Sequence, residues 1–365
     1  MTDTIPNPES EGPSGGWGSV KSIARILGDD KPSPMVLEEL ARQNKPGGVM
    51  CVSCAWPKPA NYHPFEFCEN GAKATISDLT SARCTPDFWS DHTVQSLRGW
   101  KDYDLEQTGR LTHPLRYDEA SDRYVEVSWD LAFEDIGQTL KSLPRESVVF
   151  YSSGHAGLEA SYLYALLART YGNNNLPQSS NMCHETTSVG LQKVIGSPVG
   201  TVIWEDLEKA DAFFFFGQNP GSNSPRFLHP LQEAKKRGAK IVTFNPVVEQ
   251  GLVSFVNPQS PVDMLTGRET QISDEYLQVK AGGDIAAILG LCKVVIEADD
   301  AAVSTGAARV LDIAFIEEHT VGLESFIDLV RSTDWSVIEK ESGLTEMAIR
   351  RAGELYVLSL IHISE

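Results

Sequence analysis

The sequence feature that most constrains the fold is an apolar strand followed by a polar turn, a pattern that occurs twice. Residues 212–216 read AFFFF and run directly into GQNP at 217–220. A wholly apolar strand is typical of a parallel sheet that is covered on both faces. A helical stretch at 231–237 leads to a second strand within 239–246, AKIVTFNP, which also ends in a polar turn. The pattern predicts a right-handed βαβ unit and an α/β fold class.

The polar turns after these strands are candidate binding sites, because open α/β sheets bind ligands beyond the carboxyl ends of their strands. The backbone amides of the turn Gly217-Gln218-Asn219-Pro220, apart from the proline, are suited to meet a phosphate. The turn lacks a G-x-G-x-x-G pattern, which argues against an NAD site. A further turn, AGGD at 281–284, precedes a helix for which Asp284 is the predicted N-cap. Taken alone, this last turn is more simply explained as a helix cap.

A polar loop at 171–190, YGNNNLPQSSNMCHETTSVG, contains an adjacent Cys183-His184 pair and leads into a helix-like run at 186–195. A loop of this composition buries little apolar surface, which favours a role other than packing. A thiol beside an imidazole serves either as an activated nucleophile or as a soft metal ligand. On the pair alone, simple burial of a free cysteine is an equal alternative.

Four of the six cysteines lie within 47–124, where apolar periodicity is weak. They are Cys51, Cys54, Cys68 and Cys84. The Cys51-x-x-Cys54 spacing allows two sulfurs to face one metal centre. A structural zinc knuckle and a chance pair of cysteines both remain open as alternatives.

The stretch between the cysteines and the Cys-His loop predicts alternating helices and strands. Ser128 is a plausible N-cap for a helix in WDLAFEDIGQTLKSL. The run SVVFYSSG at 147–154 predicts a buried parallel strand. A second helix follows at 157–172 and is predicted to end on Gly172.

The run GNNNLPQSSNMCHETTSVG resembles the active-site loop of the molybdopterin-guanine-dinucleotide oxidoreductases, and in particular formate dehydrogenase-like alpha subunits of the FdhF/YdeP type. The resemblance implies that Cys183 ligates molybdenum or tungsten and that His184 handles a substrate proton. It implies a bis-molybdopterin guanine dinucleotide cofactor. The cofactor-binding residues that it implies are Ser152, Ser153, Asn181, Gly217, Asn219, Pro220, Arg226, Asn245, Gly282, Gly283 and Asp284.

The same family carries a 4Fe-4S cluster near its N-terminus, held by a C-x2-C-x3-C knuckle and a later cysteine. In this sequence Cys51 and Cys54 match the first two positions, Lys58 takes the third, and Cys68 matches the later cysteine. Asn70 takes the place of the family's lysine on the electron path. The resemblance therefore implies a cluster with three protein ligands plus another group, or one completed by Cys84.

The resemblance also implies the domain organisation and fold. We expect a small Fe–S domain followed by doubly wound, mainly parallel α/β domains. The ranges are a flexible arm with short helices at 1–46, the iron–sulfur domain at 47–127, and an incomplete molybdopterin-dinucleotide region at 128–356. The likeness stops at 357–365, which is expected to be a non-native tail on an N-terminal fragment.

Composition limits the partners and the compartment. The net charge of -19 makes nucleic acid an unfavourable partner. No apolar run of about 18 residues is present, so no membrane span is expected. Six cysteines in 365 residues are too few for a disulfide scaffold, and no export signal precedes them. The expected localisation is cytoplasmic.

The leading functional hypothesis is a two-electron oxidoreductase that acts on a small molecule, with formate suggested by the resemblance, and passes electrons to an acceptor protein or dye. One alternative is a Cys-His hydrolase or transferase with Cys183 as nucleophile, for which no orienting acid or oxyanion hole is evident. Another is a non-catalytic metal-binding stress protein with a degenerate site, which Lys58 and Asn70 favour.

Overall fold

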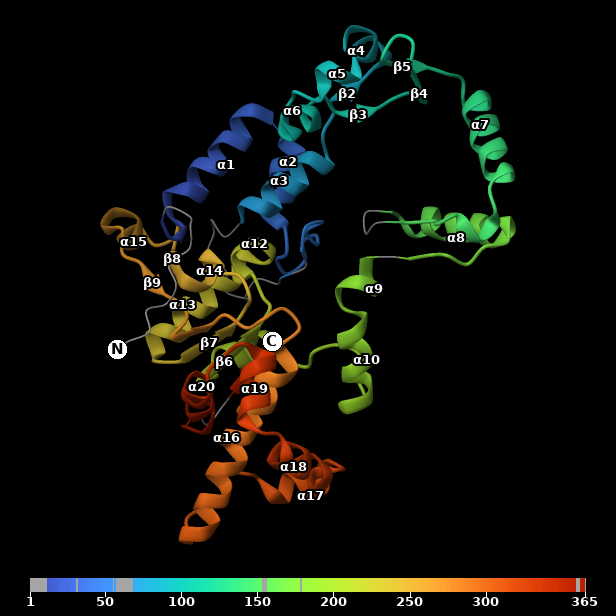
Figure 1. Ribbon diagram of the computed structural model, residues 1–365. Coiled ribbons are helices and arrows are strands. Elements are labelled where there is room, and N and C mark those ends of the chain that lie inside the picture. The colour runs from blue at the N-terminus through green and yellow to red at the C-terminus, as the bar shows by residue number, and fades with distance from the viewer. Residues whose placement is uncertain are drawn as a thin grey trace. The chain divides into compact units, whose positions relative to one another are not determined.

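The computed structural model describes residues 12–30, 32–54, 56, 68–152, 156–177, 179–358 and 362–364 (Figure 1). The chain forms two compact units. The first combines Met1–Thr75 with Val202–Glu365, and the second is Ile76–Thr201. In the described part of the chain, no helix has the length and apolar character needed to cross a membrane.

The first unit is built around a four-stranded parallel sheet in the order β10-β7-β6-β11. Its strands are β10 (Glu275–Leu277), β7 (Lys240–Phe244), β6 (Ala212–Phe216) and β11 (His362–Ser364). The two strands predicted at 212–216 and within 239–246 are confirmed. The backbone of β11 pairs with β6 inside the stretch where the family likeness ends, with His362 opposite Ala212.

Strand β6 is covered on both faces because its side chains alternate between two cores. Phe213 and Phe215 belong to one buried cluster, together with Leu228 and Leu231 of α13 (Leu228–Arg237). Phe214 belongs to a second cluster, which includes side chains of α16 (Asp284–Thr305), α19 (Trp335–Ser342) and α20 (Glu346–Leu358). Burying each phenylalanine side chain contributes about 1.5–3 kcal/mol. The all-apolar sequence of β6 is thus explained by helices on both sides of the sheet (Figure 1).

The remaining elements of the first unit surround this sheet. A small sheet joins β1 (Ser14–Gly15) to β8 (Ser254–Val256) in parallel, and β8 to β9 (Thr270–Gln271) in antiparallel. The other helices are α1 (Gly16–Asp30), α2 (Pro34–Arg42), α3 (Glu69–Asp78, whose last three residues belong to the second unit), α11 (Trp204–Leu207), α12 (Pro220–Asn223), η2 (Pro225–Phe227), α14 (Gln250–Val253), α15 (Pro261–Thr266), α17 (Ile313–His319) and α18 (Leu323–Ser332).

The second unit contains short elements and three longer helices. Its strands form two pairs, β2 (Arg83–Cys84) with β3 (Arg110–Leu111) and β4 (Leu115–Asp118) with β5 (Arg123–Glu126). The helices are α4 (Pro86–Asp91), α5 (Val94–Leu97), α6 (Asp102–Gln107), α7 (Trp129–Ser142), η1 (Arg145–Ser147), α8 (Leu158–Tyr171), α9 (Ser179–Cys183) and α10 (Glu185–Val194). Ser128 caps α7 by accepting a hydrogen bond from the Leu131 amide, as predicted. Gly172 ends α8 in the left-handed conformation, also as predicted.

The buried strand predicted at 147–154 is wrong over the described residues 147–152. No named strand includes them, and Val149 and Tyr151 are exposed. A buried parallel strand needs backbone hydrogen bonds to a neighbouring strand. Here Val148 and Phe150 form hydrogen bonds with residues of a later loop instead. The Phe150 amide donates to the Asn175 carbonyl at 3.0 Å, and the Asn173 side chain donates to the Val148 carbonyl at 2.7 Å.

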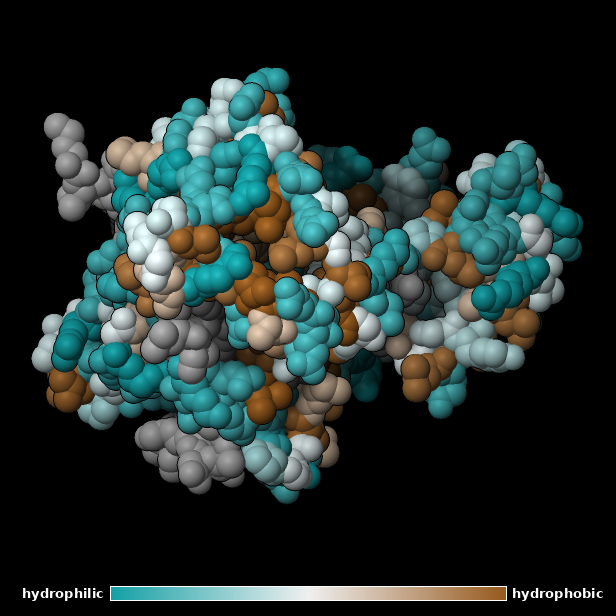
Figure 2. Space-filling model, turned by 90° about the horizontal axis from the view of Figure 1, so that it is seen from below, coloured by the Kyte–Doolittle hydropathy of each residue, from teal (hydrophilic) through white to brown (hydrophobic). Residues whose placement is uncertain are grey.

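Several large apolar side chains of both units are exposed to solvent. Figure 2 shows apolar residues lying open among polar ones on the face in view. In the second unit they include Phe133, Leu158 and Tyr162 on helices α7 and α8.

Candidate functional site

The carboxyl ends of the parallel strands bring two of the predicted turns to one edge of the sheet. Gly217 follows β6 with a φ of 65°, in the left-handed region, and its amide donates to the Phe244 carbonyl at the end of β7. Asn245 follows β7 and is buried. Its side chain donates to the Gln218 carbonyl at 3.0 Å, and its amide donates to the Leu277 carbonyl at the end of β10. Asn245 therefore fixes three strand ends in one place.

Asn219 holds the turn after β6 in shape. Its side-chain oxygen accepts from the Ser222 amide at 3.1 Å, and its Nδ2 donates to the Glu249 carboxylate at 2.6 Å. Pro220 is the first residue of α12, where the absence of an N–H costs nothing. The loops after β6 and β7 are therefore cross-linked through a carboxylate.

The glycine turn after β10 differs in one detail from the prediction. The N-cap of α16 is Gly283 and Asp284 is the first helical residue, so the predicted Asp284 cap is wrong by one position. Gly283 is needed there because a β-carbon would lie 2.7 Å from the Glu341 carbonyl oxygen. Gly282 has a φ of 82°, which strongly favours glycine.

Two of the predicted cluster cysteines converge on one glycine. A β-carbon built on Gly71 would stand 3.3 Å from the Cys51 Sγ and 3.2 Å from the Cys68 Sγ. Each sulfur also accepts a backbone hydrogen bond, Cys51 from the Ser53 amide at 3.3 Å and Cys68 from the Gly71 amide at 3.2 Å. Amide hydrogen bonds to sulfur are one of the ways a protein tunes an iron–sulfur cluster.

The other predicted ligands of the cluster are less closely gathered. Cys54 is partly exposed, and its carbonyl accepts from the Asn44 side chain at 3.0 Å. Lys58 lies outside the described residues. Cys84 is buried in the second unit. Over the ranges that the structure describes, no three His, Cys, Asp or Glu side chains form a group suited to a metal ion.

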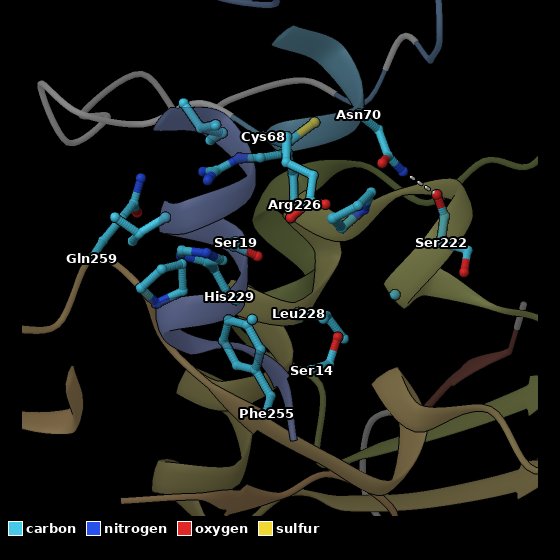
Figure 3. Close-up of a pocket in the computed structure, with 18 of the residues that line it drawn as sticks. Ser14, Ser19, Cys68, Asn70, Ser222, Arg226, Leu228, His229, Phe255 and Gln259 are labelled. Atoms are coloured by element: carbon cyan, nitrogen blue, oxygen red, sulfur yellow. Dashed lines mark hydrogen bonds between the residues drawn. The ribbon is translucent and has the colours of Figure 1, made fainter. Parts of the chain in front are cut away.

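Asn70, which takes the place of the family's lysine, connects the cysteine segment to the sheet edge. Its side chain donates to the Ser222 carbonyl of α12 at 2.6 Å, the bond drawn in Figure 3. Ser222 in turn donates its amide to Asn219. The Cys68 segment and the turn after β6 are therefore joined by a short path of hydrogen bonds.

The Cys183-His184 pair lies at the junction of two helices in the second unit. Cys183 is the last residue of α9 and is exposed, and His184 is the residue before α10. The His184 amide donates to the Ser180 carbonyl at 3.1 Å, which continues the turn of α9. The Asn181 side chain donates to the Glu185 carboxylate. Ser152 belongs to the same unit, whereas Ser153 lies outside the described residues.

Arg226 lines a cavity that the sequence did not reveal. The cavity has a volume of about 910 Å³ and lies among α1, the start of α3, η2, α13 and β8 (Figure 3). Arg226 is 3% exposed, and burial lowers its pKa to about 10. The strand-end residues Gly217, Asn219 and Asn245 do not line this cavity. The sequence signal that could have indicated this cavity is the pair Arg226 and His229, which are three residues apart at the start of a helix.

Strands β6, β7 and β10 and the turns that follow them lie within residues 110–343, which match one family model. The family model described as molybdopterin oxidoreductase matches residues 110–343, and the chain belongs to this family. The resemblance drawn from the sequence is thereby confirmed.

Individual relatives agree with this assignment. The chain is 45% identical to Protein YdeP of Escherichia coli over 347 residues, 95% of this chain and 46% of that protein. It is 37% identical to an uncharacterized oxidoreductase of Mycobacterium tuberculosis, over 88% of this chain and 41% of that protein. It is 26% identical to the F420-dependent formate dehydrogenase subunit alpha of Methanocaldococcus jannaschii, over 69% of this chain and 33% of that protein. The chain spans about half the length, or less, of the curated relatives that it matches.

Proposed function

We propose that this chain is part of a molybdenum- or tungsten-dependent two-electron oxidoreductase that resembles formate dehydrogenase. In this proposal the cofactor is bis-molybdopterin guanine dinucleotide, and a 4Fe-4S cluster carries electrons to an acceptor protein or dye. The proposed organisation keeps the predicted ranges, with the iron–sulfur domain at 47–127 and the dinucleotide region at 128–356. The proposed compartment is the cytoplasm.

The observation that carries the redox proposal is the approach of the Cys51 and Cys68 thiols to Gly71. Both sulfurs accept hydrogen bonds from backbone amides, and a β-carbon added at Gly71 would lie within 3.3 Å of each. Packing alone does not require two thiols to face a glycine in this way. This donor set suits an iron–sulfur cluster, and Cys54, three residues after Cys51, supplies the next ligand in the proposal.

The strand-end residues support the proposed binding of the dinucleotide. Gly217, Asn219, Pro220 and Asn245 follow parallel strands at the edge where α/β sheets bind ligands. Gly282 and the N-cap Gly283 directly precede α16, Asp284 is its first residue, and the N-terminus of a helix favours a negative group. Ser152, Ser153, Asn181 and Arg226 are proposed on the family resemblance.

Cys183 and His184 are proposed to act on the substrate. The bound metal would accept two electrons from the substrate, and Cys183 would be its protein ligand. An imidazole can accept and donate a proton, and in the proposal His184 handles the proton of the substrate. For formate, the loss of one proton and two electrons leaves carbon dioxide.

The test is metal content measured by mass spectrometry on anaerobically purified full-length protein. About four irons and one molybdenum or tungsten per chain are expected. Cys51→Ser and Cys68→Ser should lower iron and leave molybdenum, whereas Cys183→Ser should lower molybdenum and leave iron. Cys292→Ser, on α16, is the control and should change neither. Zinc in place of iron, or no metal, would refute the redox proposal.

A non-catalytic metal-binding protein is the second candidate, and the Asn70 side chain favours it. The family's lysine on the electron path carries a positive charge. Asn70 is neutral, and its side-chain amide donates to the Ser222 carbonyl instead. Sustained reduction of a dye by formate or by another small substrate would exclude this candidate.

A further inference from the structure

The residues that follow α2 turn back toward the end of this helix and lead directly into the first cysteine pair. The Asn44 amide donates to the Val49 carbonyl at 2.7 Å, and the Val49 amide donates to the Arg42 carbonyl at 3.3 Å. Gly48 is needed in this turn, because a β-carbon there would lie 1.8 Å from the Arg42 carbonyl oxygen. Cys51 follows shortly after Val49, so the turn delivers the Cys51 backbone beside the end of α2.

The side chain of Asn44 binds both ends of the Cys51-x-x-Cys54 segment. Its Oδ1 accepts from the Cys51 amide at 2.7 Å, and its Nδ2 donates to the Cys54 carbonyl at 3.0 Å. An asparagine side chain offers an acceptor and two donors in one planar amide group, whereas an ionised aspartate offers acceptors alone. A single amide group therefore holds the first and the last residue of the cysteine spacing together.

A local role in the turn does not explain these contacts. Asn44 has a φ of 54°, in the left-handed region, which asparagine tolerates better than most residues. Asparagine side chains in turns commonly bond to the backbone two residues further on. The Asn44 side chain instead contacts residues seven and ten positions further along the chain.

Gln43, the preceding residue, makes a corresponding connection to the Cys68 segment. It is 3% exposed, and its Nε2 donates to the Gly71 carbonyl at 3.2 Å and to the Thr75 hydroxyl, both on α3. The Gly71 amide in turn donates to the Cys68 sulfur. Two consecutive side chains after α2 therefore bind the backbones of both cysteine segments.

We propose that Asn44 is a positioning residue, which fixes the backbones of Cys51 and Cys54 so that their two sulfurs face one metal centre. It acts through the backbone of both cysteines and is not itself a ligand. The role rests on the iron–sulfur function proposed above and deepens it. The convergence of two thiols does not itself require iron, so it is tested without iron.

The first test uses phenylarsine oxide, a trivalent arsenical that bridges two neighbouring thiols. Two As–S bonds form, the oxygen on arsenic leaves as water with the two thiol protons, and no electron is transferred. The full chain is freed of metal by a chelator and carries Cys68→Ser, which leaves Cys51 and Cys54 as the expected pair. One equivalent should bind, and mass mapping of peptides should place it on these two cysteines.

Asn44→Gly removes both side-chain hydrogen bonds and suits the left-handed backbone, so it adds no strain. It should weaken arsenical binding roughly tenfold, the effect expected for the loss of such bonds. Asn44→Asp has nearly the same shape and keeps the acceptor for the Cys51 amide, but it cannot donate to the Cys54 carbonyl. It should weaken binding at least as much.

Asp122→Gly is the matched control. Asp122 also has a left-handed φ, and its carboxylate accepts from the Gln95 amide, but it lies in the second unit. This change should leave arsenical binding within about twofold of the unaltered value, because it removes no bond to either cysteine. Circular dichroism checks that each variant is folded.

Retention of iron by the full-length protein gives a second measurement. Asn44→Gly should lose iron to a chelator several-fold faster than the unaltered protein, and Asp122→Gly should not. A residue that serves only the stability of the fold would lower the urea midpoint and change neither arsenical binding nor iron loss.

Arsenical binding that both Asn44 variants leave unchanged, or that Asp122→Gly weakens equally, would overturn the proposal. So would an arsenical that does not bridge Cys51 and Cys54. Absence of iron from the unaltered full-length protein would instead refute the cluster, and the arsenical result would still decide the role of Asn44.

Discussion

Gly251 and Gly221 are in direct backbone contact. A β-carbon on Gly251 would lie 2.6 Å from the Cα of Gly221 and 2.8 Å from its amide nitrogen. Gly221 belongs to α12, after β6, and Gly251 belongs to α14, after β7. The close contact of these two short helices keeps the turns at the sheet edge together.

Replacing Gly251 by alanine is expected to destabilise the first unit by about 1–3 kcal/mol, because the obstructing atoms are backbone and cannot rotate away. Urea unfolding followed by tryptophan fluorescence measures the change. Gly28→Ala is the control in the same unit, since nothing lies within 4 Å of its added β-carbon. That change should be neutral or stabilising by up to about 1 kcal/mol. Equal effects of the two variants would contradict the contact.

Gly71→Ala is expected to lower iron content several-fold in the proposed iron–sulfur protein. The added methyl would stand 3.2 Å from the Cys68 sulfur, 3.3 Å from the Cys51 sulfur and 2.7 Å from the Gln43 side-chain oxygen. Iron analysis and visible absorption of the purified protein measure the loss, with Gly28→Ala again as control. Full iron content in Gly71→Ala, with an unchanged spectrum, would show that no cluster lies between these thiols.

Asp299 is expected to make the stability of the first unit depend on acidic pH. It is 2% exposed and accepts from the Arg309 guanidinium at 2.5 Å and from the amides of Val310 and Leu311. The hydrogen bond from Arg309 is the largest cause that lowers its pKa. A lowered carboxyl pKa gives stability that is present above the unfolded value and is lost as pH falls through the folded value.

Asp299→Asn should therefore cost about 1–3 kcal/mol at neutral pH and flatten the decline of stability below about pH 4. Asp300→Asn is the matched control one residue away. Asp300 pairs with Arg331 at 2.7 Å, but both side chains are half exposed, so the loss should stay below about 1 kcal/mol. Urea midpoints from pH 3 to 7 measure both. A similar pH slope in Asp299→Asn and in the unaltered chain would refute the assignment.

Tyr276 is expected to remain un-ionised well above the pH at which ordinary tyrosines titrate. Its hydroxyl donates to the Val247 carbonyl at 2.8 Å and accepts from the Glu249 amide at 2.9 Å. Burial raises its pKa to about 12. Because the folded pKa is raised, its stabilising contribution is complete below about pH 10 and is lost as pH rises toward 12.

Tyr276→Phe should cost about 1–2 kcal/mol and remove the latest step of the tyrosinate absorbance titration. Tyr162→Phe, which alters an exposed ring, should leave stability unchanged and leave that latest step in place. Loss of an ordinary step in Tyr276→Phe would disprove the burial effect.

Strands β6 and β7 could be predicted from the sequence because their residues are almost all apolar, as in strands that are buried on both faces. Five consecutive apolar residues at 212–216 have few alternatives to a strand that is covered on both faces. The run at 147–152 is similarly apolar, yet it forms hydrogen bonds with Asn173 and Asn175 of a later loop, and the local sequence pattern does not contain this tertiary context.

The turns at the strand ends could be predicted from local sequence, whereas the cavity depends on the packing of remote segments. The turns at Gly217 and Asn245 follow from their position after strands, and their convergence follows from parallel pairing. The cavity beside Arg226 is formed by segments that are remote in sequence, among them α1, α3, α13 and β8. No single stretch of the sequence therefore predicts it. The domain ranges and the ligand roles stay predictions.

The bond between Asn70 and Ser222 has a mechanical consequence. Asn70 stands two residues after Cys68, and Ser222 is held by the cap that Asn219 makes. A ligand that displaces the turn after β6 must either break this bond or move the Cys68 segment with it. Movement of the turn and movement of the Cys68 segment are therefore coupled through this hydrogen bond.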